Sequence, residues 1–172
     1  MAKLRFEGLS DADVTSACEA IGRFTVTVSY LDIEISKLMA SMFELHRSPF
    51  ADNLIHSIDL GRKREIINAF AKPLKTSQLA VDLAKLASDV GDTVSDRNVV
   101  AHGALRLIDD QICIASFGAQ SEFRMAAAFA IDGRPSVLRV ADLPAKTEKA
   151  AGLGLKATRL AAVMRQMHDT LS

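Results

Sequence analysis

The sequence predicts an α+β protein, mainly α, in which a four-helix up-and-down bundle carries a small antiparallel β-meander between its third and fourth helices. Apolar residues recur at intervals of three or four over most of the chain, as they do in helices with one buried face. From about residue 105 to 140 the interval falls to about two, which is typical of half-buried strands. No linker, internal repeat or low-complexity tract divides the 172 residues, so we expect a single domain over residues 1–172.

The composition argues against several classes of protein. Apolar residues make up 49% of the chain, which is enough for a core, and a formal net charge of zero leaves any nucleic-acid binding to a local patch. Cys18 and Cys113 are far apart and lack metal-binding spacing, which favours reduced thiols over a disulfide framework or a zinc site. Because the sequence shows neither a signal peptide nor a long uncharged apolar run, we expect a soluble, cytoplasmic protein with no membrane partner.

The first helix is predicted from Asp11 to about Arg47. Ser10, with Asp13 three residues later, has the pattern of a capping box, and Pro49 follows the helix. Its apolar seam alternates steps of three and four, through Ile21, Phe24, Val28, Leu31, Ile35, Leu38, Met42 and Leu45. Such a helix is about 55 Å long at 1.5 Å per residue, more than one small bundle needs, so we predict a homodimer along the first and third helices.

The second helix is predicted over Ala51–Ala71, before Pro73. It contains Arg62, Lys63 and Arg64, the densest basic run in the chain. We predict that these three residues bind the substrate, provided that they lie beside the motif of the third helix. The alternative is an ordinary solvated helix face.

The third helix is predicted to begin after Thr76 or Ser77 and to end before Gly103. Its seam runs through Leu79, Leu83, Leu86, Val90, Thr93, Arg97 and Val100. Arg97 therefore occupies a position where the pattern asks for an apolar residue. A buried charge is costly unless it is paired, so we expect either an ion pair with Asp32 or Glu34 or a site at the edge of the core or at a subunit interface.

The remainder is predicted as strands followed by a fourth helix. The strands are expected at Leu105–Ile108, Ile112–Phe117, Phe123–Ile131 and Val137–Val140, joined by turns rich in Asp and Gly. The last helix begins between Asp142 and Pro144. Its inward face carries Leu153, Ala157, Leu160, Met164, Met167 and Leu171.

The candidate catalytic residues are Arg97, Asn98 and His102. Asn98 and His102 are four positions apart and share one helix face, while Arg97 is rotated by about 140° from His102. A guanidinium binds phosphate and an imidazole transfers protons near neutral pH, so the cluster suits a phosphodiester. The alternative is structural, with Arg97 paired to a carboxylate and His102 a helix-end residue. Because the sequence has no Gly-rich phosphate loop, nucleophile elbow or metal-binding motif, we expect neither metal nor cofactor.

The stretch Arg97–Gly103 resembles the signature of the HEPN superfamily, an Arg commonly followed by Asn, then a His after four to six positions. The order of helices is also similar. The resemblance implies a dimeric four-helix bundle and a metal-independent endoribonuclease acting in toxin–antitoxin, phage-defence or RNA-processing systems. Carried over, Arg97 would bind the scissile phosphate, His102 would act as general acid or base on the 2′-hydroxyl attack, and Asn98 would orient the site.

The resemblance also implies binding partners and an alternative, non-catalytic function. RNA is the expected substrate, and an antitoxin or regulatory protein is an expected partner. Some members of the family have lost activity, so the alternative is a non-catalytic dimeric module that binds RNA, a nucleotide or a protein. Toxins of this family that a nucleotidyltransferase modifies carry a Tyr two residues after the His; this chain has Ala104 there, so we do not expect that regulation.

Overall fold

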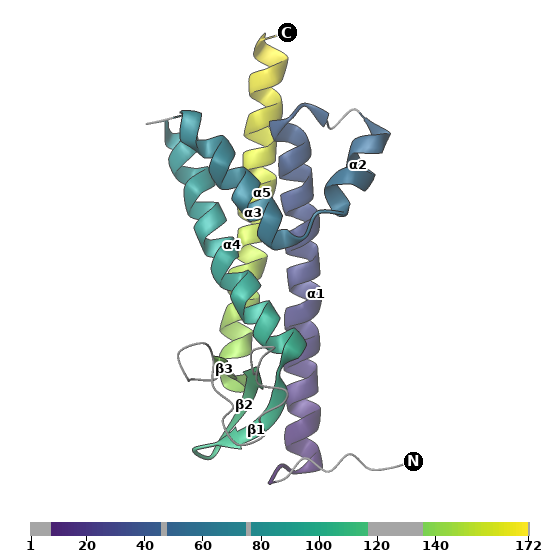
Figure 1. The fold of residues 1–172 in the computed structure, drawn as a ribbon, viewed down its shortest axis with the longest axis vertical. Helices are drawn as coiled ribbons and strands as arrows, with labels where there is room; N and C mark the ends of the chain where they lie inside the picture. The colour runs from purple at the N-terminus through teal and green to yellow at the C-terminus, as the bar shows by residue number, and fades with distance from the viewer. Residues whose placement is uncertain (1–7, 46–47, 75–76, 117–135, 172) are drawn as a thin grey trace, which may run out of the picture. The chain divides into compact units, whose positions relative to one another are not determined.

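A computed structural model describes residues 8–45, 48–74, 77–116 and 136–171. In these ranges the protein is mainly helical and has a three-stranded antiparallel sheet, as the predicted α+β class requires (Figure 1). Its helices and strands are α1 (Asp11–Met42), α2 (Pro49–His56), α3 (Leu60–Ala71), α4 (Gln78–His102), β1 (Ala104–Ile108), β2 (Gln111–Ser116), β3 (Ser136–Arg139) and α5 (Leu143–Leu171). Short 3-10 helices lie at Lys72–Leu74 and Val140–Asp142.

The chain divides into two compact units. The sheet unit consists of residues 1–25 and 95–147, and the helical unit consists of residues 26–94 and 148–172. Helices α1, α4 and α5 contribute to both units.

The core of the helical unit is built from one face of each long helix. The predicted seam of α1 is confirmed from Phe24 to Met42, where its six residues are at most 6% exposed; Ile21 is only partly buried, and Leu45 lies beyond the end of the helix. The facing apolar residues are Ile67 of α3, Leu83, Leu86 and Val90 of α4, and Leu153, Ala157, Leu160 and Met164 of α5. The seam is therefore buried by the chain itself and is not free for a second copy, contrary to the premise of the predicted dimer.

Ion pairs join α4 to α5 in the helical unit. Lys149 Nζ lies 3.0 Å from Asp92 Oδ2, and Lys156 Nζ lies 3.4 Å from Asp82 Oδ1. The numbers rise along α5 as they fall along α4, so the two helices are antiparallel here.

The single helix predicted over Ala51–Ala71 is wrong. Residues 49–56 form α2 and residues 60–71 form α3, with Asp59 between them as the N-cap of α3, where its carboxylate accepts a hydrogen bond from Arg62 N at 3.1 Å. Pro49 does not follow the first helix directly, because α1 ends at Met42 and Glu44 takes a positive φ of 55° that a right-handed helix cannot continue. Pro49 instead opens α2, where its missing N–H costs nothing.

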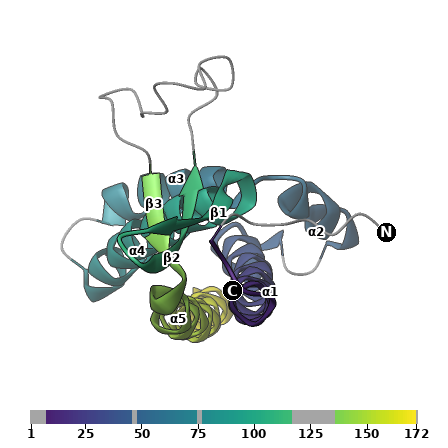
Figure 2. The same cartoon turned by 90° about the horizontal axis from the view of Figure 1, so that it is seen from below.

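The sheet unit confirms the capping box and three of the predicted strands. Asp13 N donates to Ser10 Oγ at 3.2 Å, and Ser10 N donates to Asp13 Oδ2 at 3.0 Å. The Ser10 hydroxyl, which donates to Asp13 Oδ2 at 2.6 Å, and the Ser10 N–H together lower the pKa of the Asp13 carboxyl. In the sheet, β2 lies between β1 and β3 (Figure 2). The predicted strand Phe123–Ile131 and the turns on either side of it lie outside the described residues.

A two-residue turn joins β1 to β2. Ile108 pairs with Gln111, and Asp109 and Asp110 between them have φ values of 48° and 57°. Two consecutive positive φ values are the signature of the type I′ turn, whose twist matches that of the hairpin. Asp tolerates this conformation better than most residues, which explains an Asp-Asp pair at the tip.

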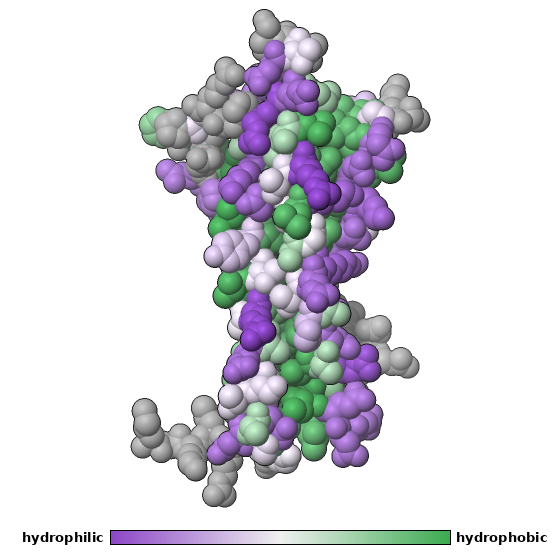
Figure 3. Space-filling model, turned by 180° about the vertical axis from the view of Figure 1, so that it is seen from behind, coloured by the Kyte–Doolittle hydropathy of each residue, from purple (hydrophilic) through white to green (hydrophobic). Residues whose placement is uncertain are grey.

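The surface mixes polar and apolar residues. Figure 3 shows one face of the molecule, on which apolar residues lie among charged ones. Large apolar side chains that remain exposed include Val26, Tyr30 and Ile33 of α1 and Phe50 and Leu54 of α2. In the described part of the chain, no helix combines the length and the apolar character needed to span a bilayer.

Candidate functional site

The candidate catalytic residues lie together at the C-terminal end of α4, in the sheet unit. Arg97, Asn98 and His102 are all exposed, and His102 is the last residue of the helix. The predicted helix end is confirmed. The structure thus places a guanidinium, an amide and an imidazole at one solvent-facing helix terminus.

Gly103 fixes this terminus against the sheet. Its N–H donates to Val99 O at 2.8 Å, which closes the last turn of the helix. A Cβ at this position would lie 2.5 Å from Ile114 Cγ2, 2.5 Å from Val99 O and 3.1 Å from Ala115 O. No side chain fits in that space, so glycine is required here because the helix end and β2 approach closely.

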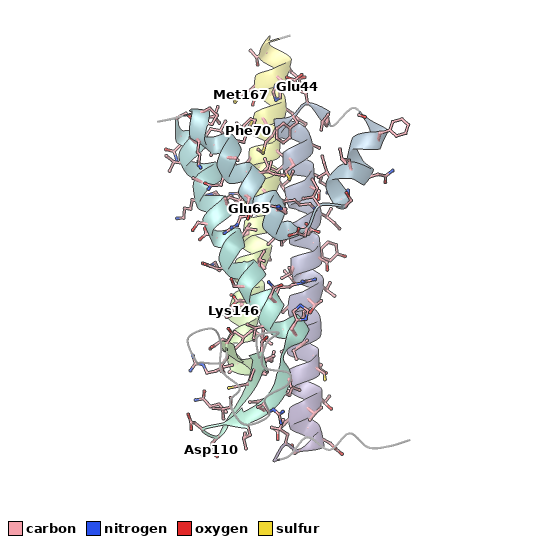
Figure 4. All side chains as sticks on the ribbon, viewed as in Figure 1. Glu44, Glu65, Phe70, Asp110, Lys146 and Met167 are labelled. Carbon is pink, nitrogen blue, oxygen red and sulfur yellow. The ribbon has the colours of Figure 1, made fainter. Side chains whose placement is uncertain are left out.

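A salt bridge beside the motif joins α4 to the start of α5. Lys146 Nζ lies 2.7 Å from Asp96 Oδ2, and both side chains are partly shielded from water, at 31% and 23% exposure. Figure 4 labels Lys146 on α5. Because Asp96 directly precedes Arg97, this pair and the Gly103 contact restrain the helix on both sides of the candidate residues.

Arg97 is exposed and is not part of a buried seam, contrary to its predicted position. The buried seam of α4 ends at Thr93, which is 3% exposed. Arg97 Nη1 donates to Asn98 Oδ1 at 3.3 Å, and Arg97 forms no salt bridge within the described ranges. Among the described residues, the guanidinium therefore keeps most of its donors free for a ligand.

The predicted carboxylate partners of Arg97 bind other groups. Asp32 Oδ1 accepts from Lys63 Nζ at 2.7 Å. Glu34 accepts from Lys37 Nζ at 2.6 Å and from Thr158 Oγ1 at 2.8 Å, and the bond from Lys37 is the main cause that lowers the pKa of the Glu34 carboxyl. The structural interpretation, with Arg97 paired to one of these carboxylates, is not supported.

The His102 imidazole is exposed and makes no hydrogen bond to another described residue. It is therefore available for proton exchange with a ligand, which a general acid or base needs. His168, by contrast, lies 2.8 Å from Glu44 through its Nδ1.

The basic run of α3 does not behave as one surface. Arg62 is exposed and bonds Glu65 at 2.7 Å, which raises the pKa of its guanidinium. Lys63 is 0% exposed, so the predictions that it binds substrate or lies on a solvated face are both wrong. Arg64 is partly exposed, and the whole run belongs to the helical unit, whereas Arg97 belongs to the sheet unit.

The buried ammonium of Lys63 is held by two acceptors, Asp32 Oδ1 at 2.7 Å and Ser36 Oγ at 2.9 Å. Sequence reasoning missed this cluster, although a signal was present. Lys63 precedes the buried Ile67 and Ala71 by one and two turns, so helical spacing places it on the inward face of α3.

Metal chemistry gains no support from the side-chain clusters. No group of three or more His, Cys, Asp or Glu residues with metal-binding geometry occurs in the portion of the chain that the structure describes.

Comparison with known proteins found no matching family model, no matching curated protein and no matching solved structure.

Proposed function

We propose that the protein is a metal-independent endoribonuclease of the HEPN type, which cleaves RNA by attack of a 2′-hydroxyl on the adjacent phosphodiester. The observation that carries this proposal is the exposure of Arg97 and His102 at one helix end, with neither side chain paired to a carboxylate among the described residues. A purely structural cation in an ion-pair network would show such a partner.

The chemistry needs few groups. Arg97 binds the non-bridging oxygens of the phosphate through two N–H donors and stabilises the charge that develops there. His102 removes the proton of the 2′-hydroxyl as its oxygen bonds to phosphorus, and the P–O5′ bond breaks. The 5′-oxygen takes a proton, and the products are a 2′,3′-cyclic phosphate and a 5′-hydroxyl. Asn98 orients Arg97 through the 3.3 Å hydrogen bond.

One copy of the motif offers one imidazole, whereas the reaction needs a base and then an acid. We therefore propose a homodimer that brings a second His102 to the phosphate, and a HEPN-like bundle of α1, α3, α4 and α5 as its scaffold. Because the α1 seam is buried within the chain, the contact is expected on the exposed face of α1 that carries Val26, Tyr30 and Ile33. A stable contact should bury more than about 1,000 Å² in total.

Sedimentation at micromolar concentration tests the dimer. A single species of 18.6 kDa, the mass of one chain, would contradict it. Tyr30→Glu places a charge on the exposed face and should dissociate the dimer without loss of helix content. Leu38→Glu is unsuitable, since Leu38 is 0% exposed and a buried charge there would unfold the chain.

The activity is tested by incubating the protein with single-stranded and structured RNA in EDTA. Cleavage that leaves 2′,3′-cyclic phosphate ends is expected, and His102→Ala and Arg97→Ala should each lower its rate by about 10²-fold or more. His56→Ala is the matched control, because His56 is also an exposed histidine in the last turn of a helix. Activity that is undiminished in His102→Ala, or that needs a metal ion, contradicts the proposal.

Intact RNA in every reaction supports the second candidate, a non-catalytic module that binds RNA, a nucleotide or a regulatory protein such as an antitoxin. The observation in its favour is the apolar face of α2, where Phe50 is 84% exposed and Leu54, one turn later, is 65% exposed. Large exposed apolar side chains in adjacent turns are typical of a protein contact. Loss of partner binding by Phe50→Ser would then identify the surface.

A further inference from the structure

A groove lies between α3 and α4 in the helical unit, with a volume of about 440 Å³. This volume is in the range of roughly 300–1,000 Å³ that is usual for small-molecule sites. The α4 side is formed by Ala84, Ala87 and Ser88, whose small side chains leave the space open. Polar side chains of α3 and its C-cap line the opposite side.

The α3 side presents a row of hydrogen-bond donors. Arg64, Asn68 and Lys72 follow one another at intervals of four residues, so they share one helix face. At 1.5 Å per residue the row extends over about 12 Å. It begins with a guanidinium, continues with an amide and ends with an ammonium group.

Gly91 lets Arg64 lie along α4. A Cβ on Gly91 would be 2.8 Å from Arg64 Nη1 and 3.2 Å from Arg64 Cδ, so any larger residue would displace this side chain. Glycine in the middle of a long helix is unfavourable, because it loses more backbone freedom on folding than any other residue. The chain accepts this cost one turn from Ala87, and the Arg64 side chain occupies the space that a Cβ would fill.

The two cations are only weakly paired among the described residues. Glu65, labelled in Figure 4, also lines the groove; its carboxylate lies 3.9 Å from Arg64 Nη2 and bonds Arg62 more closely, at 2.7 Å. Lys72 forms no ion pair with any residue that the structure describes. The side chain of Asn68 is likewise without a hydrogen-bond partner there. The described lining thus holds two cations against one carboxylate, which also pairs with Arg62 outside the groove, so the groove offers net positive charge and free donors to an anion.

We propose that this groove binds the phosphate groups of a nucleotide-sized ligand. Arg64 takes one phosphate through two parallel N–H bonds, Lys72 takes a second negative oxygen farther along, and Asn68 and Ser88 hydrogen-bond the part between them. A free nucleotide and an RNA strand share this chemistry. The site lies in the helical unit and includes neither Arg97 nor His102, so the inference does not depend on the proposed catalysis.

Titration followed by amide NMR tests the inference, with three probes: inorganic pyrophosphate, AMP and a short 2′-O-methylated oligouridylate. The methylated strand has no 2′-hydroxyl and cannot be cleaved. Saturable shifts in the facing residues of α3 and α4 are expected. Tighter binding of AMP or pyrophosphate identifies a nucleotide site, and tighter binding of the oligomer identifies an RNA path.

Variants assign the binding to the groove. Arg64→Ala should weaken it about tenfold or more, as expected for a lost charged hydrogen bond. Ala84→Leu fills the groove and should abolish binding without any change of charge, and Gly91→Ala should weaken it by displacing Arg64. The matched control is Lys85→Ala, because Lys85 is exposed on α4 but does not line the groove.

Two results would overturn the inference: the absence of saturable shifts with all three probes, or equal affinity in the wild type, Arg64→Ala and Ala84→Leu. Failure here is distinguishable from failure of the proposed function. If the protein does not cleave RNA but its α3 and α4 resonances respond to AMP, only the proposed ribonuclease activity is contradicted. If it cleaves RNA but responds to none of the probes, only the proposed groove is contradicted.

Discussion

The buried ion pair of Lys63 and Asp32 should respond very differently to the loss of either partner. The Lys63 side chain is 0% exposed, whereas the Asp32 side chain keeps 37% of its surface in water. Removal of the carboxylate leaves a buried ammonium without a counter-charge, but removal of the ammonium leaves a carboxylate that water can solvate. We therefore expect Asp32→Ala to be strongly destabilising and Lys63→Met to be nearly neutral.

The magnitudes follow from this asymmetry. Leaving one partner of a buried pair uncompensated costs about 3–5 kcal/mol, and we expect the lower end, about 3 kcal/mol, because Ser36 Oγ still accepts from Lys63 at 2.9 Å. Met matches the length of the lysine stem and needs no polar partner, so Lys63→Met should change stability by less than about 1 kcal/mol. A loss of 3 kcal/mol is a large share of the roughly 5–15 kcal/mol of a typical domain.

Urea unfolding followed by circular dichroism measures both variants. Arg62→Ala is the control, since Arg62 is the neighbouring cation and its partner Glu65 is also at the surface; its midpoint should equal that of the wild type. A loss of stability in Lys63→Met as large as that in Asp32→Ala would contradict the expected asymmetry. Equal losses would mean that the ammonium contributes more through its bonds than its burial costs.

Other elements give predictions that the same methods check. Gly103→Ala should destabilise the protein by about 1–3 kcal/mol, since its methyl group would lie 2.5 Å from atoms on two sides, and an unchanged urea midpoint would contradict the close approach. Asp110→Gly should stabilise it by up to about 1 kcal/mol, because glycine adopts the φ of 57° without strain; a lower midpoint would argue against the type I′ turn. In native protein at pH 8 a disulfide reagent should modify the exposed Cys18 and spare Cys113, because burial shields the Cys113 thiol and raises its pKa. Both thiols should react in urea. Modification of both in native protein would contradict the burial of Cys113. Folding lowers the pKa of Glu34 from 4.5, so its contribution to the free energy of unfolding is present above pH 4.5 and is lost as pH falls through the folded-state pKa. Glu34→Gln should therefore lose less stability in acid than the wild type does. Parallel curves of stability against pH for the two proteins would exclude this role.

Local signals predicted much of the fold. The capping box at Ser10, the alternating seam of α1 and the change of period after Gly103 each depend on a few neighbouring residues, and the corresponding elements occur where the sequence indicated. Periodicity works at these positions because the buried face of a helix or strand repeats at a fixed interval.

Three features were not predicted, although a local signal for two of them was present in the sequence. Lys63 is buried because two acceptors from α1, distant in sequence, satisfy its ammonium. Arg97 keeps the heptad spacing of α4 but is exposed, because spacing does not show where the packed neighbours of a helix end. The break between α2 and α3 was overlooked because an apolar pattern continues through Ile58, although Asp59 is a good N-cap residue.

The central claim is that Arg97 and His102 act together on one phosphodiester. Single-turnover cleavage of one RNA substrate in EDTA tests it most directly, with the wild type, Arg97→Ala, His102→Ala and the double variant. If the two groups serve one transition state, each single change should lower the rate by about 10²-fold or more, and the double variant should be little slower than either single one. The claim would be contradicted if the rate losses of the two single variants multiplied in the double variant, or if either single variant kept the wild-type rate.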